Sequence, residues 1–133
     1  MGAQFEHLFQ PIQIGSLTMP NRICFSAHAT NFAEDNLPSE RQAYYYTERA
    51  KGGVGWIVIG GSICHESSNW SGGFTLVSNE NAVAGYRKIT SMVHEYGTKI
   101  FTQIDHYGGA VPHPRTYKGP LLAPSGIPDA VEG

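Results

Sequence analysis

Hydrophobic and polar residues alternate near the start of the chain on both sides of a short turn. The two arms are Ile12–Ile14 and Leu17–Met19, and the turn between them begins with Gly15. Alternation across a two-residue, glycine-led turn predicts a β-hairpin. Pro20 ends the hairpin, because proline cannot donate to a strand ladder. The mostly apolar run 22–27 that follows has strand length and is predicted to be the first core strand.

The stretch from about 40 to 51 is predicted to be the first helix. Ser39 and Gln42 have the spacing of a capping box, and Gly52 with Gly53 offers a C-terminal stop. Three positions at i, i+3 and i+7 form its apolar face. They are Ala43, Tyr46 and Ala50.

A second helix is predicted from Asn79 or Asn81 to the residue before Gly97. Five large apolar residues keep its helical period: Val83, Tyr86, Ile89, Val93 and Tyr96.

Two further apolar runs, 56–59 and 100–104, have strand length. The first shows no alternation, as expected of a strand buried on both faces of a parallel sheet. Prolines leave little room for regular structure after the second run. They are Pro112, Pro114, Pro120, Pro124 and Pro128.

The predicted order of elements is therefore hairpin, β, α, β, α, β and loop. Strands separated by single helices run parallel through right-handed crossovers. A dinucleotide-binding sheet would carry a glycine fingerprint after its first strand, and 26–30 contains no glycine. We predict the α/β fold of the amino-terminal part of a TIM (β/α)8 barrel, which usually needs about 250 residues. The 133 residues form one partial domain: hairpin 11–20, first βα units 21–109, and loop 110–133 leading to a fourth strand.

Composition and charge narrow the possible partners. The net charge of -2 gives no basic surface for nucleic acid, and no apolar run approaches the roughly 18 residues of a membrane span. Cys24 and Cys64 both lie in apolar runs, which predicts buried, reduced thiols and a cytoplasmic protein. Two cysteines cannot supply the four thiolates of an iron-sulfur cluster, so none is predicted in this segment.

The candidate chemistry lies after the three core strands, where parallel folds bind their ligands. The segments 26–31, 60–66 and 103–109 each contain small residues and at least one histidine. Small residues let a flat ligand approach the backbone, and Gln103 offers both a donor and an acceptor. From the residues alone, the favoured interpretation is that the glycines turn the loops and Gln103 caps the sheet.

Four separated motifs resemble the Old Yellow Enzyme family of flavin oxidoreductases, including its 2,4-dienoyl-CoA reductase and trimethylamine dehydrogenase branches. The resemblance covers essentially the whole chain. The motifs are Leu8-Phe9-Gln10-Pro11-Ile12 with Gly15-Ser16-Leu17 and Asn21-Arg22-Ile23, then Arg49-Ala50-Lys51-Gly52-Gly53-Val54-Gly55-Trp56-Ile57, Gln103-Ile104-Asp105-His106-Tyr107-Gly108 and Leu122-Ala123-Pro124-Ser125.

The resemblance implies FMN at the barrel mouth, with NAD(P)H as electron donor and a small-molecule substrate. It implies hydride transfer through flavin N5, of the ene-reductase or amine-dehydrogenase type. The residues it assigns to FMN are Ser26, Ala27, His28, Ala29, Gly61 and Gln103. The residues expected on the substrate side are Asn31, His106 and Tyr107.

Two departures from the family pattern leave the substrate open. The usual Ala-Pro-Met or Ser-Pro-Met after the first strand reads Ser26-Ala27-His28, and Gly109 stands where an arginine is common. The resemblance also implies that the catalytic pair comes from strand four and the phosphate-binding loops from strands seven and eight. No catalytic residue is therefore expected in this chain, and the fragment is expected to be inactive alone.

Two other classes of function stay open at this stage. His28, His65 and His106 at three strand ends, with Asp105 and Glu66 nearby, could belong to a metal-dependent hydrolase. No His-x-His or His-Glu-x-x-His spacing supports that alternative, so no metal site is predicted. A non-catalytic subunit or truncated reading frame is the other alternative, because open sheet edges favour a complementing chain or self-association.

Overall fold

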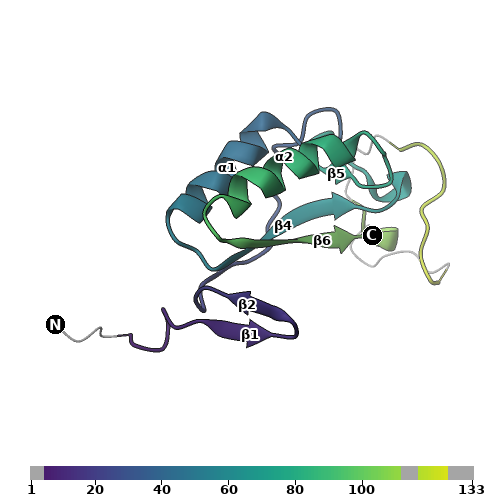
Figure 1. The fold of residues 1–133 in the computed structure, drawn as a ribbon. Helices are drawn as coiled ribbons and strands as arrows, with labels where there is room; N and C mark the ends of the chain where they lie inside the picture. Colours follow the sequence, from purple (N-terminus) through teal and green to yellow (C-terminus); the bar gives the residue numbers. More distant parts are fainter. Residues whose placement is uncertain (1–4, 112–116, 126–133) are drawn as a thin grey trace.

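The computed structural model describes residues 5–111 and 117–125, so the first four residues and Pro112, Pro114 and Pro128 of the predicted loop lie outside the described residues (Figure 1). The predicted order of hairpin, strand, helix, strand, helix and strand is confirmed, with one short strand and two 3-10 turns in addition. The elements are β1 (Ile12–Ile14), β2 (Leu17–Met19), β3 (Cys24–Phe25), α1 (Glu40–Lys51), β4 (Trp56–Ile63), η1 (Glu66–Ser68), β5 (Thr75–Leu76), α2 (Ala82–His94), β6 (Lys99–Asp105) and η2 (Gly108–Ala110).

β4 is the central strand of a parallel sheet. It pairs with β6 along its length, from Trp56 opposite Lys99 to Ile63 opposite Asp105. β3 and β5 pair with opposite ends of β4. The first core strand is shorter than the predicted 22–27, because only two of its residues keep a ladder with β4. β5 was not predicted, since two residues are too few to form a periodic pattern.

Both helices lie on the same side of this sheet (Figure 1). The hydrophobic core forms between them and the helix-facing side chains of β4. Its buried residues are Ala43, Tyr46, Ala50, Ile57, Ile59, Ile89 and Val93. The predicted apolar face of α1 is therefore confirmed.

The predicted face of α2 is wrong at its two ends. Val83 is 57% exposed and Tyr96 is 44% exposed, whereas Ala82 is buried. Ala82 takes the inward position in the first turn, about 100° around the helix from Val83. Tyr96 lies beyond His94, the last helical residue, so the helical period no longer directs it inward.

The opposite side of the sheet is not covered by a helix in the described part of the chain. The Trp56 and Phe101 rings meet edge to face on it, with centroids 5.9 Å apart. Cys24 pairs with Trp56 and shares this side. The prediction that Cys24 and Cys64 are buried is wrong: both thiols are exposed, Cys24 because it faces the uncovered side and Cys64 because it follows the end of β4.

Local sequence explains how α1 and the hairpin form. The Ser39 hydroxyl accepts from the Gln42 N–H at 3.2 Å and the Gln42 side chain accepts from the Ser39 N–H at 3.1 Å, which confirms the capping box. Gly15 turns the hairpin with a φ of 59°.

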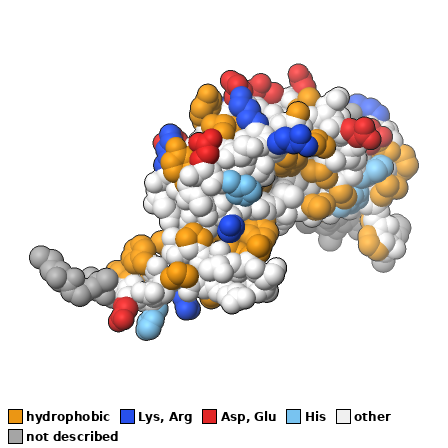
Figure 2. Space-filling view, in the orientation of Figure 1, with side chains coloured by type: hydrophobic (Ala, Val, Ile, Leu, Met, Phe, Trp, Pro, Cys, Tyr) orange, Lys and Arg blue, Asp and Glu red, His pale blue; other side chains and the backbone are white. Residues whose placement is uncertain are grey.

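Exposed hydrophobic side chains gather over the hairpin (Figure 2). They include Phe5, Leu8, Phe9, Ile14 and Leu17.

Across the described residues, neither helix has the length and apolar character needed to cross a membrane.

Candidate functional site

β4 and β6 run in the same direction, and the loops that follow them gather at one end of the sheet (Figure 1). Gly60 brings the segment after β3 to this end. A Cβ placed on Gly60 would lie 2.5 Å from the His28 carbonyl oxygen and 2.7 Å from the His28 nitrogen. Only glycine permits such an approach of two backbones. The resemblance assigns Gly61 to the flavin, and the sequence analysis did not single out Gly60, although the adjacent pair of glycines was a visible signal.

Gly61 has a different role in the same strand. The pairing of β4 with β6 shifts register between Ile59 and Ser62, and Gly61 has a φ of 72°. A Cβ on Gly61 would lie 2.6 Å from the Phe74 ring. The bulge lets the strand continue to Ile63, whereas the sequence predicted its end at 59.

Ser62 is held directly after this bulge. Its hydroxyl lies 2.6 Å from the Tyr86 hydroxyl and 2.6 Å from Thr102 Oγ1. The side chain therefore ties β4 to both α2 and β6.

The segment 26–29 presents small or exposed residues beside Gly60. Ser26, His28 and Ala29 are exposed and Ala27 is half-buried. The His28 side chain turns toward α1, where its Nε2 lies 2.9 Å from the Tyr45 hydroxyl. The Tyr45 ring is in turn covered by the Arg49 guanidinium, 3.3 Å from the ring centroid. Backbone groups and small side chains are thus what this segment offers to a ligand.

Gln103 lies on the side of the sheet that the helices leave uncovered. Side chains alternate along a strand, so Gln103 shares the side of Phe101 while Ile100 packs into the core. The Gln103 side chain is exposed and donates to no described residue. The exposed Gln103 amide and the closely approached backbone at Gly60 are groups that could hold a planar heterocycle such as the isoalloxazine of FMN.

A buried serine joins the loops after β4 and β6. Ser67 Oγ lies 2.8 Å from His65 Nδ1 and 3.0 Å from His106 Nε2. Ser67 is fully buried, while both histidine residues are exposed. Sequence reasoning selected the two histidines in separate segments and missed Ser67, because no motif connects position 67 with position 106.

The remaining predicted residues, Tyr107 and Asn31, lie in separate contacts. The Tyr107 N–H donates to Ser68 Oγ at 2.6 Å, and its ring meets Phe74 edge to face with centroids 6.3 Å apart. Burial raises the pKa of Tyr107, and the charge of Asp105 adds to the effect. Asn31 has a φ of 55° and packs against Gly73, whose Cβ would lie 3.0 Å from the Asn31 Cα.

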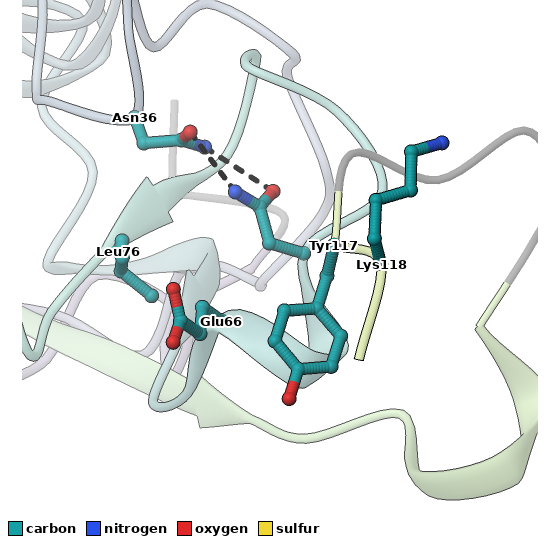
Figure 3. A pocket seen from close by; sticks show the side chains of 6 residues that line it. Asn36, Glu66, Leu76, Tyr117 and Lys118 are labelled. Carbon is teal, nitrogen blue, oxygen red and sulfur yellow. Dashed lines mark hydrogen bonds between the residues drawn. The ribbon is translucent and has the colours of Figure 1, made fainter. Parts of the chain in front are cut away.

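A pocket of about 350 Å³ opens beside η1 (Figure 3). Its lining residues are Asn36, Glu66, Asn69, Leu76, Tyr117 and Lys118. The Asn36 and Asn69 amides bond to each other in both directions, at 3.2 and 2.9 Å, and Asn36 Nδ2 also donates to the Phe74 carbonyl at 2.8 Å. These amides connect two loops. The Lys118 side chain points away from the Glu66 carboxylate.

The structure gives no support to the metal-dependent hydrolase. Among the described residues, no three His, Cys, Asp or Glu side chains gather closely enough to hold a metal ion. His28 is hydrogen-bonded to Tyr45, whereas His65 and His106 meet at Ser67.

Comparison with known proteins identifies what this arrangement resembles. Residues 7–129 match the model of the NADH:flavin oxidoreductase / NADH oxidase family. A similar relative is an N,N-dimethylglycine/sarcosine dehydrogenase of Chromohalobacter salexigens, which is 37% identical over 96% of this chain and 19% of its own length. A multifunctional alkene reductase/demethylase of Caballeronia cordobensis is 30% identical over 94% of this chain and 19% of its own length.

A solved structure agrees with these sequence matches. The old yellow enzyme of Trypanosoma cruzi superposes with a TM-score of 0.82 at 26% identity, over 95% of this chain and 36% of that chain. The present chain thus spans about a fifth of the length of the curated relatives it matches.

Proposed function

The chain belongs to the NADH:flavin oxidoreductase / NADH oxidase family, and on that premise we propose that it supplies part of the FMN site of an oxidoreductase that transfers hydride through flavin N5. Its fold is the amino-terminal part of a TIM barrel of the Old Yellow Enzyme type. The observation that carries the proposal is the contact of Gly60 with the His28 backbone, at the same strand ends as the exposed amide of Gln103.

In this proposal, the segment after β3 and residues of β4 and β6 hold the flavin. Ser26, Ala27, His28 and Ala29 offer backbone groups and small side chains beneath the ring. Gly61 has no side chain, so the flavin can approach the backbone of β4 closely. The Gln103 amide forms hydrogen bonds with the pyrimidine edge of the flavin. When bound, FMN supplies a two-electron carrier that accepts and returns hydride. The part played by these residues is to bind and orient it.

We favour oxidation of an N-methylated amino acid as the reaction of the whole protein. The relative at 37% identity is named for dimethylglycine and sarcosine, and the relative at 30% identity is named in part as a demethylase. Reduction of an activated alkene by NAD(P)H is the second candidate, since the latter name also includes alkene reductase. Asn31, His106 and Tyr107 are proposed to face the substrate in either case.

The uncovered surfaces support a longer protein. An apolar groove of about 250 Å³ between α2 and β6 is lined by Ile59, Tyr86, Thr90, Ile100, Phe101 and Thr102. Ile104, on the same strand, is 65% exposed. We propose that further strands and helices cover this groove, and that these added elements carry the catalytic pair and the phosphate-binding loops. A complementing chain is the alternative source of these missing elements.

The free thiols of Cys24 and Cys64 suit a reducing compartment, and we propose that the protein lies in the cytoplasm.

One expression experiment tests this proposal. The 133-residue chain is produced alone and extended by the sequence encoded downstream, and both proteins are analysed for flavin absorbance, metal content and oligomeric state. Stoichiometric FMN in the extended protein is expected. Bound zinc without flavin, or no flavin in either protein, would contradict the proposal.

A pair of variants of the extended protein tests the site itself. Gln103→Leu is expected to weaken FMN binding by roughly tenfold, the cost of one hydrogen bond. Gln10→Leu is the matched control, because Gln10 is also exposed but lies near the hairpin, before β1. Equal FMN affinity of the two variants would remove Gln103 from the proposed site.

A third measurement decides between the two reactions. Reduction of the flavin by N,N-dimethylglycine without oxygen supports amine oxidation, and reoxidation of the reduced flavin by an activated alkene supports alkene reduction.

A further inference from the structure

Two backbone N–H groups determine which ring nitrogen of each histidine beside Ser67 carries the proton. The Ser67 N–H donates to His65 Nδ1 at 3.1 Å, and the Gly108 N–H donates to His106 Nδ1 at 3.0 Å. A nitrogen that accepts a hydrogen bond carries no proton in the neutral ring. Both neutral histidines therefore carry their proton on Nε2.

These tautomers give the hydrogen bonds through Ser67 a single direction. His106 Nε2–H donates to Ser67 Oγ across 3.0 Å, which leaves the Ser67 hydroxyl proton to donate to His65 Nδ1 across 2.8 Å. The His106 Nε2–H and the Ser67 hydroxyl proton then each have one acceptor. Within the described residues, the last donor, His65 Nε2–H, has no hydrogen-bond partner.

The arrangement strengthens that last donor. His65 Nδ1 accepts from two groups of Ser67, its N–H and its hydroxyl, and this withdraws electron density from the ring. Hydrogen bonds in a chain polarise one another, so the Nε2–H becomes a better donor without the ring becoming charged. Ser67 is fully buried and cannot turn to water, whereas His65 is exposed at the loop end of the sheet.

We infer that His65 is a substrate-binding residue whose Nε2–H donates to a negatively polarised oxygen of the substrate, with Ser67 and His106 as its positioning residues. This inference rests on the proposed function, which provides two sources of such an oxygen. They are the carboxylate of an N-methylated amino acid and the carbonyl of an activated alkene. The adjacent Tyr117 ring, with its centroid 6.5 Å from that of His65, forms an aromatic wall beside the donor.

A purely structural role for the three residues predicts a different outcome. In that case the hydrogen bonds would only join the loops after β4 and β6, and their loss would lower stability without changing ligand affinity selectively. Ligand affinity and tautomer must therefore be measured directly, apart from turnover.

The experiment uses the extended protein with bound FMN and calorimetric titration with three probes. N,N-dimethylglycine carries a carboxylate, cyclohex-2-enone carries a carbonyl, and N,N-dimethylethylamine has no acceptor oxygen. His65→Leu is expected to weaken binding of at least one oxygen-bearing probe by roughly tenfold to hundredfold. Binding of the amine should not change. The probe that is affected identifies the source of the oxygen.

Three further variants distinguish loss of the His65 hydrogen bond from a general effect of replacing a histidine. His65→Gln is expected to restore much of the affinity, because a glutamine amide nitrogen can occupy the place of Nε2. Ser67→Ala should weaken binding by a few-fold, since it removes only one of the two bonds on Nδ1. His94→Leu is the histidine control, because His94 is an exposed residue in the last turn of α2.

Nitrogen-15 spectra of histidine-labelled protein give a readout that does not depend on activity. His65 should show a protonated Nε2 and an unprotonated Nδ1, and the Nε2 signal should move when the bound probe is added. A protonated Nδ1, no binding of either oxygen-bearing probe, or equal losses for all three probes would each overturn the inference. Selective affinity losses without flavin reduction or reoxidation would instead overturn the proposed function and leave the inference standing.

Discussion

Gly60 and His28 approach so closely that a methyl group on Gly60 would meet the His28 carbonyl oxygen at 2.5 Å. The contact joins β4 to the segment that follows β3. Backbone atoms cannot move aside as the end of a flexible side chain can, so a larger residue at position 60 must displace the segment 26–29. This segment is the part of the proposed flavin site that depends most directly on one residue.

Gly60→Ala should therefore reduce FMN affinity in the extended protein by tenfold or more, as the displaced segment loses its fit to the ring. Gly72→Ala is the matched control, because a Cβ there meets no atom within 4 Å. Fluorescence titration with FMN measures both. If the two variants bind FMN equally well, the segment 26–29 is not part of the flavin site.

Ser39→Ala should destabilise the protein by about 1 kcal/mol, within a range of about 0.5–2 kcal/mol for loss of an N-cap. The substitution removes the acceptor of the Gln42 N–H and the donor to the Phe32 carbonyl. Urea unfolding measures the change in the free energy of unfolding. Ser91→Ala, at an exposed position of α2, should leave it nearly unchanged.

Asn36→Ala should cost about 1–3 kcal/mol of stability, because it leaves partly buried groups without partners. Asn36 Nδ2 donates to the Ser71 carbonyl at 3.1 Å and to the Phe74 carbonyl at 2.8 Å. Its φ of 61° adds strain for alanine. Thermal unfolding measures the melting temperatures of Asn36→Ala and of a control, Asn81→Ala. Asn81 is a suitable control because its side chain makes no capping hydrogen bond. Equal melting temperatures would mean that the loop connection contributes little.

Stability should fall at high pH through Tyr46. Burial raises the pKa of Tyr46 from 10.0 to about 12, so the unfolded chain releases the hydroxyl proton at a lower pH than the folded protein does. The contribution is fully present below pH 10 and is lost as the pH rises toward 12. A difference of two pKa units corresponds to about 3 kcal/mol.

Tyr46→Phe removes this titration. Between about pH 9 and about pH 12, its free energy of unfolding should fall by less than that of the unsubstituted protein. Tyr44→Phe, at a position that is 56% exposed, should keep the original pH dependence. Urea unfolding at the two pH values provides the comparison, and parallel losses in all three proteins would show that Tyr46 is not responsible.

Elements specified by neighbouring residues could be predicted from the sequence. The capping box of Ser39 and Gln42 and the glycine-led turn at Gly15 use groups within a few positions of each other. The segments that carry Gln103 and His106 could be selected because parallel strands place their carboxyl ends together.

Features that depend on distant contacts could not be predicted in the same way. The bulge at Gly61 involves the pairing of β4 with β6 and the close packing of the Phe74 ring, both distant in the sequence. Ser67 likewise meets His106 across 39 positions. The exposure of Cys24 depends on which side of the sheet the helices cover. An apolar neighbourhood in the sequence does not contain that information.

The sheet with helices on only one side divides substitutions into two kinds. A substitution at Ile57 or Ile89, which lie in the core beneath the helices, should first lower the stability of the fold. A change at Cys24 or Gln103, on the uncovered side, leaves the core intact and alters what the sheet can receive. Substitutions on the uncovered side are therefore expected to change what the sheet binds, whereas substitutions beneath the helices are expected to change stability.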